Sequence, residues 1–136
     1  MASARLEWSH ANPILKVSDM PRAVAYYRDV LGLIPGWMWE ERIGGMHTEH
    51  GSIEIYLSQA DSPSPSRLAV FVDDADAIYE EYRAAGAKTV DEPKTEPWGL
   101  RGFTVRDLDG NLIGIAHEVY SPLDRDEYRD LTAERR

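Results

Sequence analysis

Residues 14–33 read "ILKVSDMPRAVAYYRDVLGL", and this stretch predicts a short strand followed by a helix. The apolar strand leads into Asp19, whose carboxylate is suited to capping the free N–H groups at a helix start. Ala23 and Tyr27 then stand four residues apart, on one helical face. Gly32 follows at the position typical of a residue just past a helix end.

The same pattern returns later in the chain. Residues 67–87 repeat residues 12–32 at an offset of 67 − 12 = 55, so Asp74 and Tyr82 take the places of Asp19 and Tyr27. In the repeat, the helical stripe predicted from this pattern is Ile78, Tyr82 and Ala85. The segments that we expect as strands after the helices are 36–42, 46–50 and 52–58 in the first half, and 88–90, 101–107 and 111–119 in the second. We interpret Gly44–Gly45 as a hairpin turn. The order, strand, helix and about three strands repeated once, predicts an α+β fold with helices on one side of antiparallel-rich sheets.

The length of 136 residues suits a single domain, residues 1–136. Within it we expect module 1 at about residues 10–59 and module 2 at about 66–120. The Ser- and Pro-rich stretch 58–66 links the modules. We expect residues 121–136 to form a polar tail with a short final helix.

Composition excludes several classes of function. The 24 acidic and 15 basic residues give a net charge of −9, which argues against nucleic acid as a partner. The chain has no cysteine and therefore no thiolate nucleophile or disulfide. No apolar run approaches the roughly 20 residues of a membrane span, and the N-terminus lacks an apolar signal region. We expect a cytoplasmic protein with no membrane partner.

The stretches "ILKVSDMPRAVAYYRDVLGL" and "PWGLRGFTVRDLDGNLIGI" (97–115) resemble the vicinal oxygen chelate superfamily over roughly residues 10–120. That superfamily includes glyoxalase I, extradiol dioxygenases, fosfomycin-resistance enzymes and bleomycin-resistance proteins. The resemblance implies two tandem βαβββ modules, with mixed sheets curved like cups and helices on the outside. It also implies a homodimer, because members close the cup by pairing units across a two-fold axis.

Enzymes of the superfamily place metal ligands at four positions, which correspond here to Asn12, Glu54, Arg67 and Gly114. Only Glu54 is a credible ligand, because glycine has no side chain and arginine cannot coordinate. A catalytic metal needs about three protein ligands. The resemblance therefore implies no metal and no cofactor, and it favours a protein that is not an enzyme.

The polar candidates allow more than one interpretation. Glu54 pairs with Arg67 where a metal would otherwise sit, or it serves as a general base. His47 and Glu49 are predicted to share one face of a strand, so a facial triad with His10 is conceivable. Four scattered histidines in 136 residues are ordinary, which favours the interpretation without a metal role, and contact between His47 and an organic ligand is a further alternative. His117 falls in step with the predicted core face of its strand.

The aromatic residues are mostly Trp and Tyr, which suit a surface that is apolar yet hydrogen-bonds. Trp37 and Trp39 alternate with Met38 and share one strand face, as packing residues or as a pocket wall. Trp98, between Pro97 and Gly99, resembles a bleomycin-resistance loop whose Trp faces a groove. The residues that we expect to contact a ligand are Trp37, Trp39, His47, Glu54, Tyr56, Arg67, Phe71, Trp98 and Phe103.

These features predict a non-enzymatic binding protein of the bleomycin-resistance type. It would confer antibiotic resistance by sequestering a bulky, planar aromatic or glycopeptide natural product in grooves at a homodimer interface. The alternative is a divergent lyase, isomerase or dioxygenase of the same superfamily. A third interpretation is a ligand-responsive accessory protein with no role in resistance.

Overall fold

The computed structural model describes residues 8–132. The chain divides into two compact units, each with one helix and its own sheet. Unit 1 is Met1–Ser66 with Asp107–Asn111, and unit 2 is Arg67–Arg106 with Leu112–Arg136. The predicted order of strand, helix and further strands is present in both units, and the α+β prediction is confirmed.

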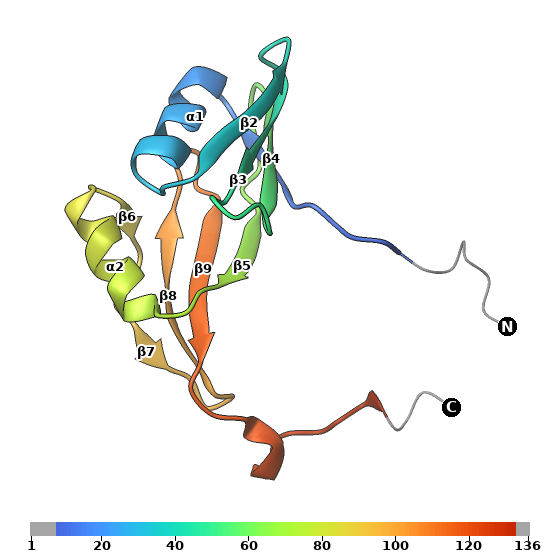
Figure 1. Cartoon of the computed structure of the whole chain (residues 1–136), viewed down its shortest axis with the longest axis vertical. Helices are drawn as coiled ribbons and strands as arrows, with labels where there is room; N and C mark the ends of the chain where they lie inside the picture. The colour runs from blue at the N-terminus through green and yellow to red at the C-terminus, as the bar shows by residue number, and fades with distance from the viewer. Residues whose placement is uncertain (1–7, 133–136) are drawn as a thin grey trace, which may run out of the picture. The chain divides into compact units, whose positions relative to one another are not determined.

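In unit 1, a four-stranded sheet carries one helix on one of its faces (Figure 1). Its strand order is β1-β4-β3-β2, with β1 parallel to β4 and the remaining pairs antiparallel. The elements are β1 (Ile14–Val17), α1 (Met20–Asp29), β2 (Ile34–Trp39), β3 (Ile43–His47) and β4 (Glu54–Gln59).

The helix α1 begins as the sequence predicts. Asp19 is its N-cap, and the Asp19 carboxylate accepts a hydrogen bond from the Arg22 backbone N–H at 3.1 Å. Met20, Ala23 and Tyr27 are buried against the sheet, together with Leu15, Val17 and Leu57. Burial of these apolar side chains is the main term that holds the helix on the sheet.

In unit 2, the sheet order is β5-β9-β8-β6, β5 is parallel to β9, and β7 also pairs with β8. The elements are β5 (Arg67–Phe71), α2 (Ala75–Ala84), β6 (Lys88–Thr89), β7 (Lys94–Thr95), β8 (Leu100–Arg106), β9 (Leu112–Glu118) and the 3₁₀ helix η2 (Pro122–Asp124). The short strand β7 is absent from the prediction, and the predicted final helix is reduced to the three residues of η2.

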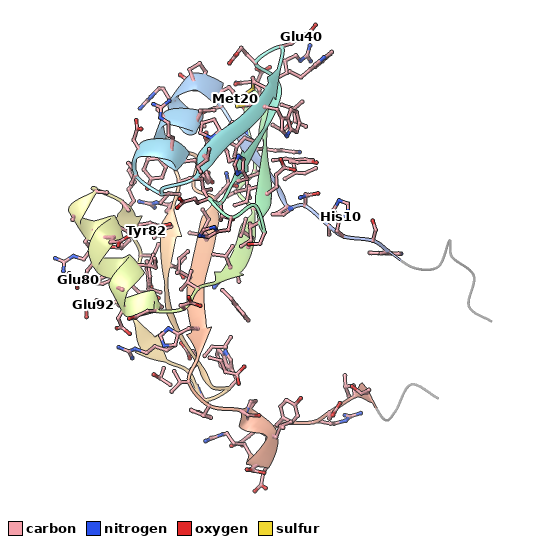
Figure 2. The ribbon with its side chains drawn as sticks, in the orientation of Figure 1. His10, Met20, Glu40, Glu80, Tyr82 and Glu92 are labelled. Carbon is pink, nitrogen blue, oxygen red and sulfur yellow. The ribbon has the colours of Figure 1, made fainter. Side chains whose placement is uncertain are left out.

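The buried stripe of α2 differs from the predicted one. Tyr79 is buried and packs edge-on against Phe103 at 5.1 Å between ring centroids, whereas Ala85 is exposed. The helix is therefore rotated relative to the predicted stripe, because the large Tyr79 ring fills the space over the sheet. Glu80 lies on the side of α2 that points away from the sheet (Figure 2).

The N-terminus of α2 is held by polar contacts. The His117 Nδ1 atom accepts a hydrogen bond from the Ala75 backbone N–H at 2.9 Å, which agrees with the predicted inward position of His117. Arg101 donates two hydrogen bonds to the Asp76 carboxylate, at 2.8 and 2.9 Å. These hydrogen bonds lower the pKa of Asp76 below its usual range.

The turn between β2 and β3 lies at Glu40–Glu41, so the predicted turn at Gly44–Gly45 is wrong. Glu40 and Glu41 have φ values of 50° and 55°, and the Arg42 N–H donates to the Trp39 carbonyl at 2.9 Å. Glu40 lies at the tip of the hairpin (Figure 2). Two non-glycine residues with positive φ are uncommon in this kind of turn, which usually takes Asn-Gly or Asp-Gly.

The strand β3 also ends earlier than predicted. It stops at His47, and Glu49 lies in the turn that follows. The prediction that His47 and Glu49 share a strand face is therefore wrong. His10 lies on the extended segment that precedes β1 (Figure 2). In the part of the chain that the structure describes, no three His, Cys, Asp or Glu side chains are grouped so that they could hold a metal ion, so the triad of His10, His47 and Glu49 is not formed.

The turn Asp107–Asn111 groups with unit 1 although its flanking strands belong to unit 2. Asp107 is 2% exposed and accepts hydrogen bonds from the Tyr27 hydroxyl and the Asn111 side-chain amide, both at 2.8 Å. Burial, with the adjacent Asp107 carboxylate, raises the pKa of the Tyr27 hydroxyl far above its usual range. Tyr27 is therefore a permanent donor to Asp107.

None of the helices within residues 8–132 has the length and apolar character needed to cross a membrane.

Candidate functional site

The face of the unit 1 sheet opposite α1, here called the open face, gathers most of the predicted site residues of this unit. Strand alternation places there Trp37, Ile43, Gly45, His47, Glu54 and Tyr56, while the residues between them face α1. In the strand register, Gly45 lies between Trp37 and Tyr56, and His47 lies opposite Glu54. The predicted shared face of Trp37 and Trp39 follows from the same register.

Trp37 is held on the open face by two neighbours. Its Nε1 atom donates a hydrogen bond to Oε2 of Glu54 at 3.0 Å. Its ring meets that of Tyr56 edge-on, with centroids 5.4 Å apart and planes at 82°. The Trp37 side chain remains 41% exposed, so the indole is fixed in position and still has a face available to a ligand.

Gly45 makes this arrangement possible. A Cβ atom at residue 45 would lie 2.2 Å from Nε1 of Trp37 and 2.7 Å from Oε2 of Glu54. On the other face of β3, a Cβ at Gly44 would lie 2.5 Å from the end of the Met38 side chain. The two glycines are thus strand residues that let the side chains of β2 lie across β3. This role of Gly45 was not predicted, although paired glycines beside aromatic strand residues are consistent with close packing.

Glu54 begins β4 and meets Asn12 as well as Trp37. The Asn12 side-chain amide donates to the Glu54 backbone carbonyl at 3.2 Å, so the two metal-ligand positions of unit 1 lie together. The Glu54 carboxylate itself contacts the indole N–H. Arg67 belongs to unit 2, and its pairing with Glu54 stays a prediction.

His47 has a defined tautomer in its neutral form. Its Nδ1 atom lies 2.8 Å from the Thr48 carbonyl oxygen, which can only accept, so Nδ1 carries the hydrogen. The second nitrogen, Nε2, is then a hydrogen-bond acceptor. The ring lies against Gly36, where a Cβ would approach the imidazole to 2.9 Å. His47 and Glu54 together form a polar end of the open face.

A hollow of about 460 Å³ adjoins Trp37 between α1 and the edge strand β2. Its volume lies within the range of small-molecule sites. The residues that line it are Pro21, Val24, Arg28, Pro35, Gly36, Trp37, Met38, Glu41 and Met46.

In unit 2, two predicted ligand residues lie on the sheet face opposite α2. Arg67 and Phe71 lie four residues apart on β5 and therefore share one face of the strand. Phe71 is 64% exposed. Phe103 is on the other face, 3% exposed, with its ring against Tyr79 and Tyr82. Phe103 is therefore a core residue, and its assignment to a ligand surface is corrected: it shares the strand side of Val105, which faces α2.

Trp98 lies on the predicted loop and is 56% exposed. The turn is closed by a hydrogen bond from the Gly99 N–H to the Glu96 carbonyl at 2.9 Å. Gly99 has φ of 96°, and a Cβ there would lie 2.0 Å from the Tyr120 carbonyl oxygen. The Tyr120 hydroxyl donates to the Pro97 carbonyl at 2.7 Å. These contacts fix the loop and present the Trp98 ring outward.

A depression of about 500 Å³ adjoins Trp98 in unit 2, formed by its loop and the segment that follows β9. Two aromatic rings and two prolines give it an apolar lining, and one basic and one acidic residue are also present. The residues are Pro97, Trp98, Pro122, Arg125, Glu127 and Tyr128.

The metal-ligand positions of the resembled family do not suit a metal here. Asn12 and Glu54 contribute one carboxylate in unit 1, and Arg67 and Gly114 contribute no ligand in unit 2. Within residues 8–132, no three His, Cys, Asp or Glu side chains are grouped so that they could hold a metal ion.

Comparisons with known proteins place the fold. Residues 9–115 match the family described as the Glyoxalase/Bleomycin resistance protein/Dioxygenase superfamily. The uncharacterized protein YraH of Bacillus subtilis is 27% identical over an alignment of 118 positions that covers 74% of this chain and 91% of YraH. The crystal structure of TioX from Micromonospora sp. ML1 superposes with a TM-score of 0.67 at 25% identity, covering 83% of this chain and 98% of TioX. Lactoylglutathione lyase from Agrobacterium tumefaciens gives 0.68 at 19% identity, covering 80% and 93%, which shows the fold alone.

Proposed function

This chain belongs to the Glyoxalase/Bleomycin resistance protein/Dioxygenase superfamily, and from that premise we propose that it is a non-enzymatic binding protein for a planar aromatic small molecule. It would sequester an antibiotic or similar natural product in the cytoplasm. The superfamily hosts many activities on one fold, so the proposal depends on the site rather than on the fold.

The observation that carries the proposal is the fixed, half-exposed indole of Trp37. The Glu54 carboxylate and the Tyr56 ring hold it in place, and its exposure is 41%. A flat ring held in advance loses little conformational entropy on binding, and stacking tolerates varied planar ligands.

The side chains at the four metal-ligand positions support binding over catalysis. Asn12, Arg67 and Gly114 stand where enzymes of the superfamily place ligands. Sequestration requires affinity alone, so these substitutions do not impair it. A metal-dependent reaction would need about three ligands.

Replacement of Trp37 tests the proposal directly. We expect Trp37→Ala to weaken binding of a planar dye, 9-aminoacridine, by about 2 kcal/mol, which is about 30-fold, through lost apolar area and stacking. Fluorescence titration measures the affinity, and EDTA should leave it unchanged. The matched control is Trp8→Ala, because Trp8 is 90% exposed at the chain's N-terminal segment. Equal binding by both variants, or loss of binding in EDTA, would contradict the proposal.

Trp98 is proposed as a second ligand-contacting ring. Its exposure of 56% and the depression of about 500 Å³ beside it support this role. We expect Trp98→Ala to weaken binding by about 1–3 kcal/mol, roughly 5- to 150-fold. The melting temperature should change little, because the ring is not in the core. A variant that binds normally, or that melts many degrees lower, would show that Trp98 is a structural residue.

We further propose that the protein acts as a homodimer. Ile14 is 53% exposed and Trp39 59% exposed on strands of unit 1, and Phe71 is 64% exposed in unit 2. Exposed apolar side chains on sheets are typical of surfaces that pair with another subunit. Light scattering at micromolar concentration distinguishes a dimer from the 15.4 kDa monomer.

A divergent enzyme is the second candidate, favoured by one observation. His47 lies opposite Glu54 on the neighbouring strand, and its neutral ring presents an unprotonated Nε2. Such a nitrogen can act as a general base. Turnover of a ligand that Trp37 binds, abolished by His47→Gln while binding persists, would favour this candidate over sequestration.

A further inference from the structure

The polar end of the open face offers hydrogen-bond acceptors to a ligand. The Glu54 carboxylate has two oxygens, and the Trp37 indole uses one of them as an acceptor, at 3.0 Å. His47 commits its Nδ1 hydrogen to the Thr48 carbonyl at 2.8 Å, so the neutral ring presents the Nε2 lone pair. The nearby Asn12 amide donates to the Glu54 backbone carbonyl. A ligand group that satisfies this end must therefore be a donor.

Among the described residues of unit 1, 8–66 and 107–111, no Lys or Arg lies within ion-pair distance of the Glu54 carboxylate. The residue is only half-buried, so the carboxylate is tolerated without such a partner. A cation brought to this partly desolvated carboxylate gains more than one at a fully hydrated surface. The net charge of −9 adds a long-range field that favours cations and disfavours anions.

The aromatic neighbours match the same ligand class. Trp37 and Tyr56 lie beside Glu54, with their rings edge-on at 5.4 Å. The face of an indole attracts a cation, and Trp is the best of the aromatic side chains for this interaction. A planar ring system can stack on the indole while its charged N–H group reaches the carboxylate.

From the Trp37–Glu54–His47 arrangement, we infer that the ligand of this site is a planar organic cation whose positive charge resides on an N–H group, such as a protonated aromatic amine or amidine. The inference rests on the proposed binding function and narrows the class of ligand. Neutral and anionic planar molecules of the same shape bind less tightly, because they leave the Glu54 carboxylate without a charged donor.

Three acridines that share one planar ring system separate the effect of positive charge from the effect of an N–H donor at pH 8. We expect the cation 9-aminoacridine to bind most tightly, N-methylacridinium, which has the charge but no N–H donor, to bind less tightly, and uncharged acridine to bind most weakly. Glu54→Gln retains an oxygen that accepts from the Trp37 N–H. It should weaken 9-aminoacridine binding about tenfold or more. Acridine affinity should stay within about twofold of the wild-type value, because removal of a partly exposed charge by itself has a small effect on free energy.

The matched control is Glu49→Gln, which removes the same charge from an exposed turn and should leave all three affinities unchanged. Isothermal titration calorimetry measures them independently of tryptophan fluorescence. If Glu49→Gln acts as strongly as Glu54→Gln, or if acridine binds wild type as tightly as 9-aminoacridine, the cation inference is overturned while planar-ligand binding stands. If none of the acridines binds the wild type, the proposed function and this inference fail together.

Discussion

Gly45→Ala should remove most ligand binding while leaving the protein folded. The new Cβ would lie 2.2 Å from the Trp37 Nε1 and 2.7 Å from Oε2 of Glu54, so the indole must swing away. Binding then loses both the stacking surface and the ordered carboxylate, about 2–4 kcal/mol or roughly 30- to 1,000-fold. The cost to stability should be only about 1–2 kcal/mol, because the clashing atoms are the ends of side chains that can move.

Gly114→Ala provides a control for this substitution. Gly114 also lies within a strand, but a Cβ there would approach no atom closer than 3.7 Å. This variant should bind and melt like the wild type. Titration with 9-aminoacridine and thermal melts followed by circular dichroism measure both properties. Normal binding by Gly45→Ala would mean that the position of the Trp37 indole does not determine affinity.

Asp107→Ala should produce the largest loss of stability. The Asp107 carboxylate accepts hydrogen bonds from the Tyr27 hydroxyl, the Asn111 side chain and two backbone N–H groups, at 2.8–2.9 Å. Its removal leaves the buried Tyr27 and Asn111 donors without that acceptor, and each such group costs about 1–3 kcal/mol. We expect a loss of about 3–5 kcal/mol in the free energy of unfolding, measured by urea denaturation.

Asp109→Ala is the matched control, because the Asp109 carboxylate accepts from the exposed Ser18 at the same turn. It should cost only about 1 kcal/mol. Equal losses for the two variants would show that the turn, rather than the buried carboxylate, sets the stability.

The same cluster predicts a dependence on pH. The pKa of the Tyr27 hydroxyl is raised in the folded protein, so the folded state keeps a proton that the unfolded state releases above its ordinary value of about 10. The Tyr27 contribution is therefore fully present below about pH 10 and is lost as the pH rises beyond it. Tyr27→Phe should be less stable at neutral pH by about 1 kcal/mol and should lose less stability between pH 9 and 11. A wild type and variant with parallel pH profiles would contradict this account.

Local patterns in the sequence predicted the architecture because they depend on near neighbours in the chain. The carboxylates of Asp19 and Asp74 cap their helices through N–H groups three residues away, at 3.1 Å in each case. Alternation placed Trp37 and Trp39 on one face of a strand, and the register of β2 with β3 agrees. The repeat and the 97–115 motif then indicated the superfamily, and the match of residues 9–115 to that family confirms it.

The tertiary structure decided what depends on partners distant in sequence. Paired glycines are equally compatible with a turn and with a strand. Gly44 and Gly45 lie inside β3, where Met38 and the Trp37–Glu54 pair of neighbouring strands occupy the space that a Cβ would need. Strand alternation in the sequence does not show which face of β8 is covered. Phe103 is buried because α2 covers its face, with the Tyr79 ring against it. The sequence alone indicated candidate residues for a binding surface, and these included the buried Phe103. Cross-strand register and side-chain contact determined that the Trp37 indole, Glu54 and Tyr56 meet on one face, because these contacts join β2 to β4 through the space that a glycine on β3 leaves free.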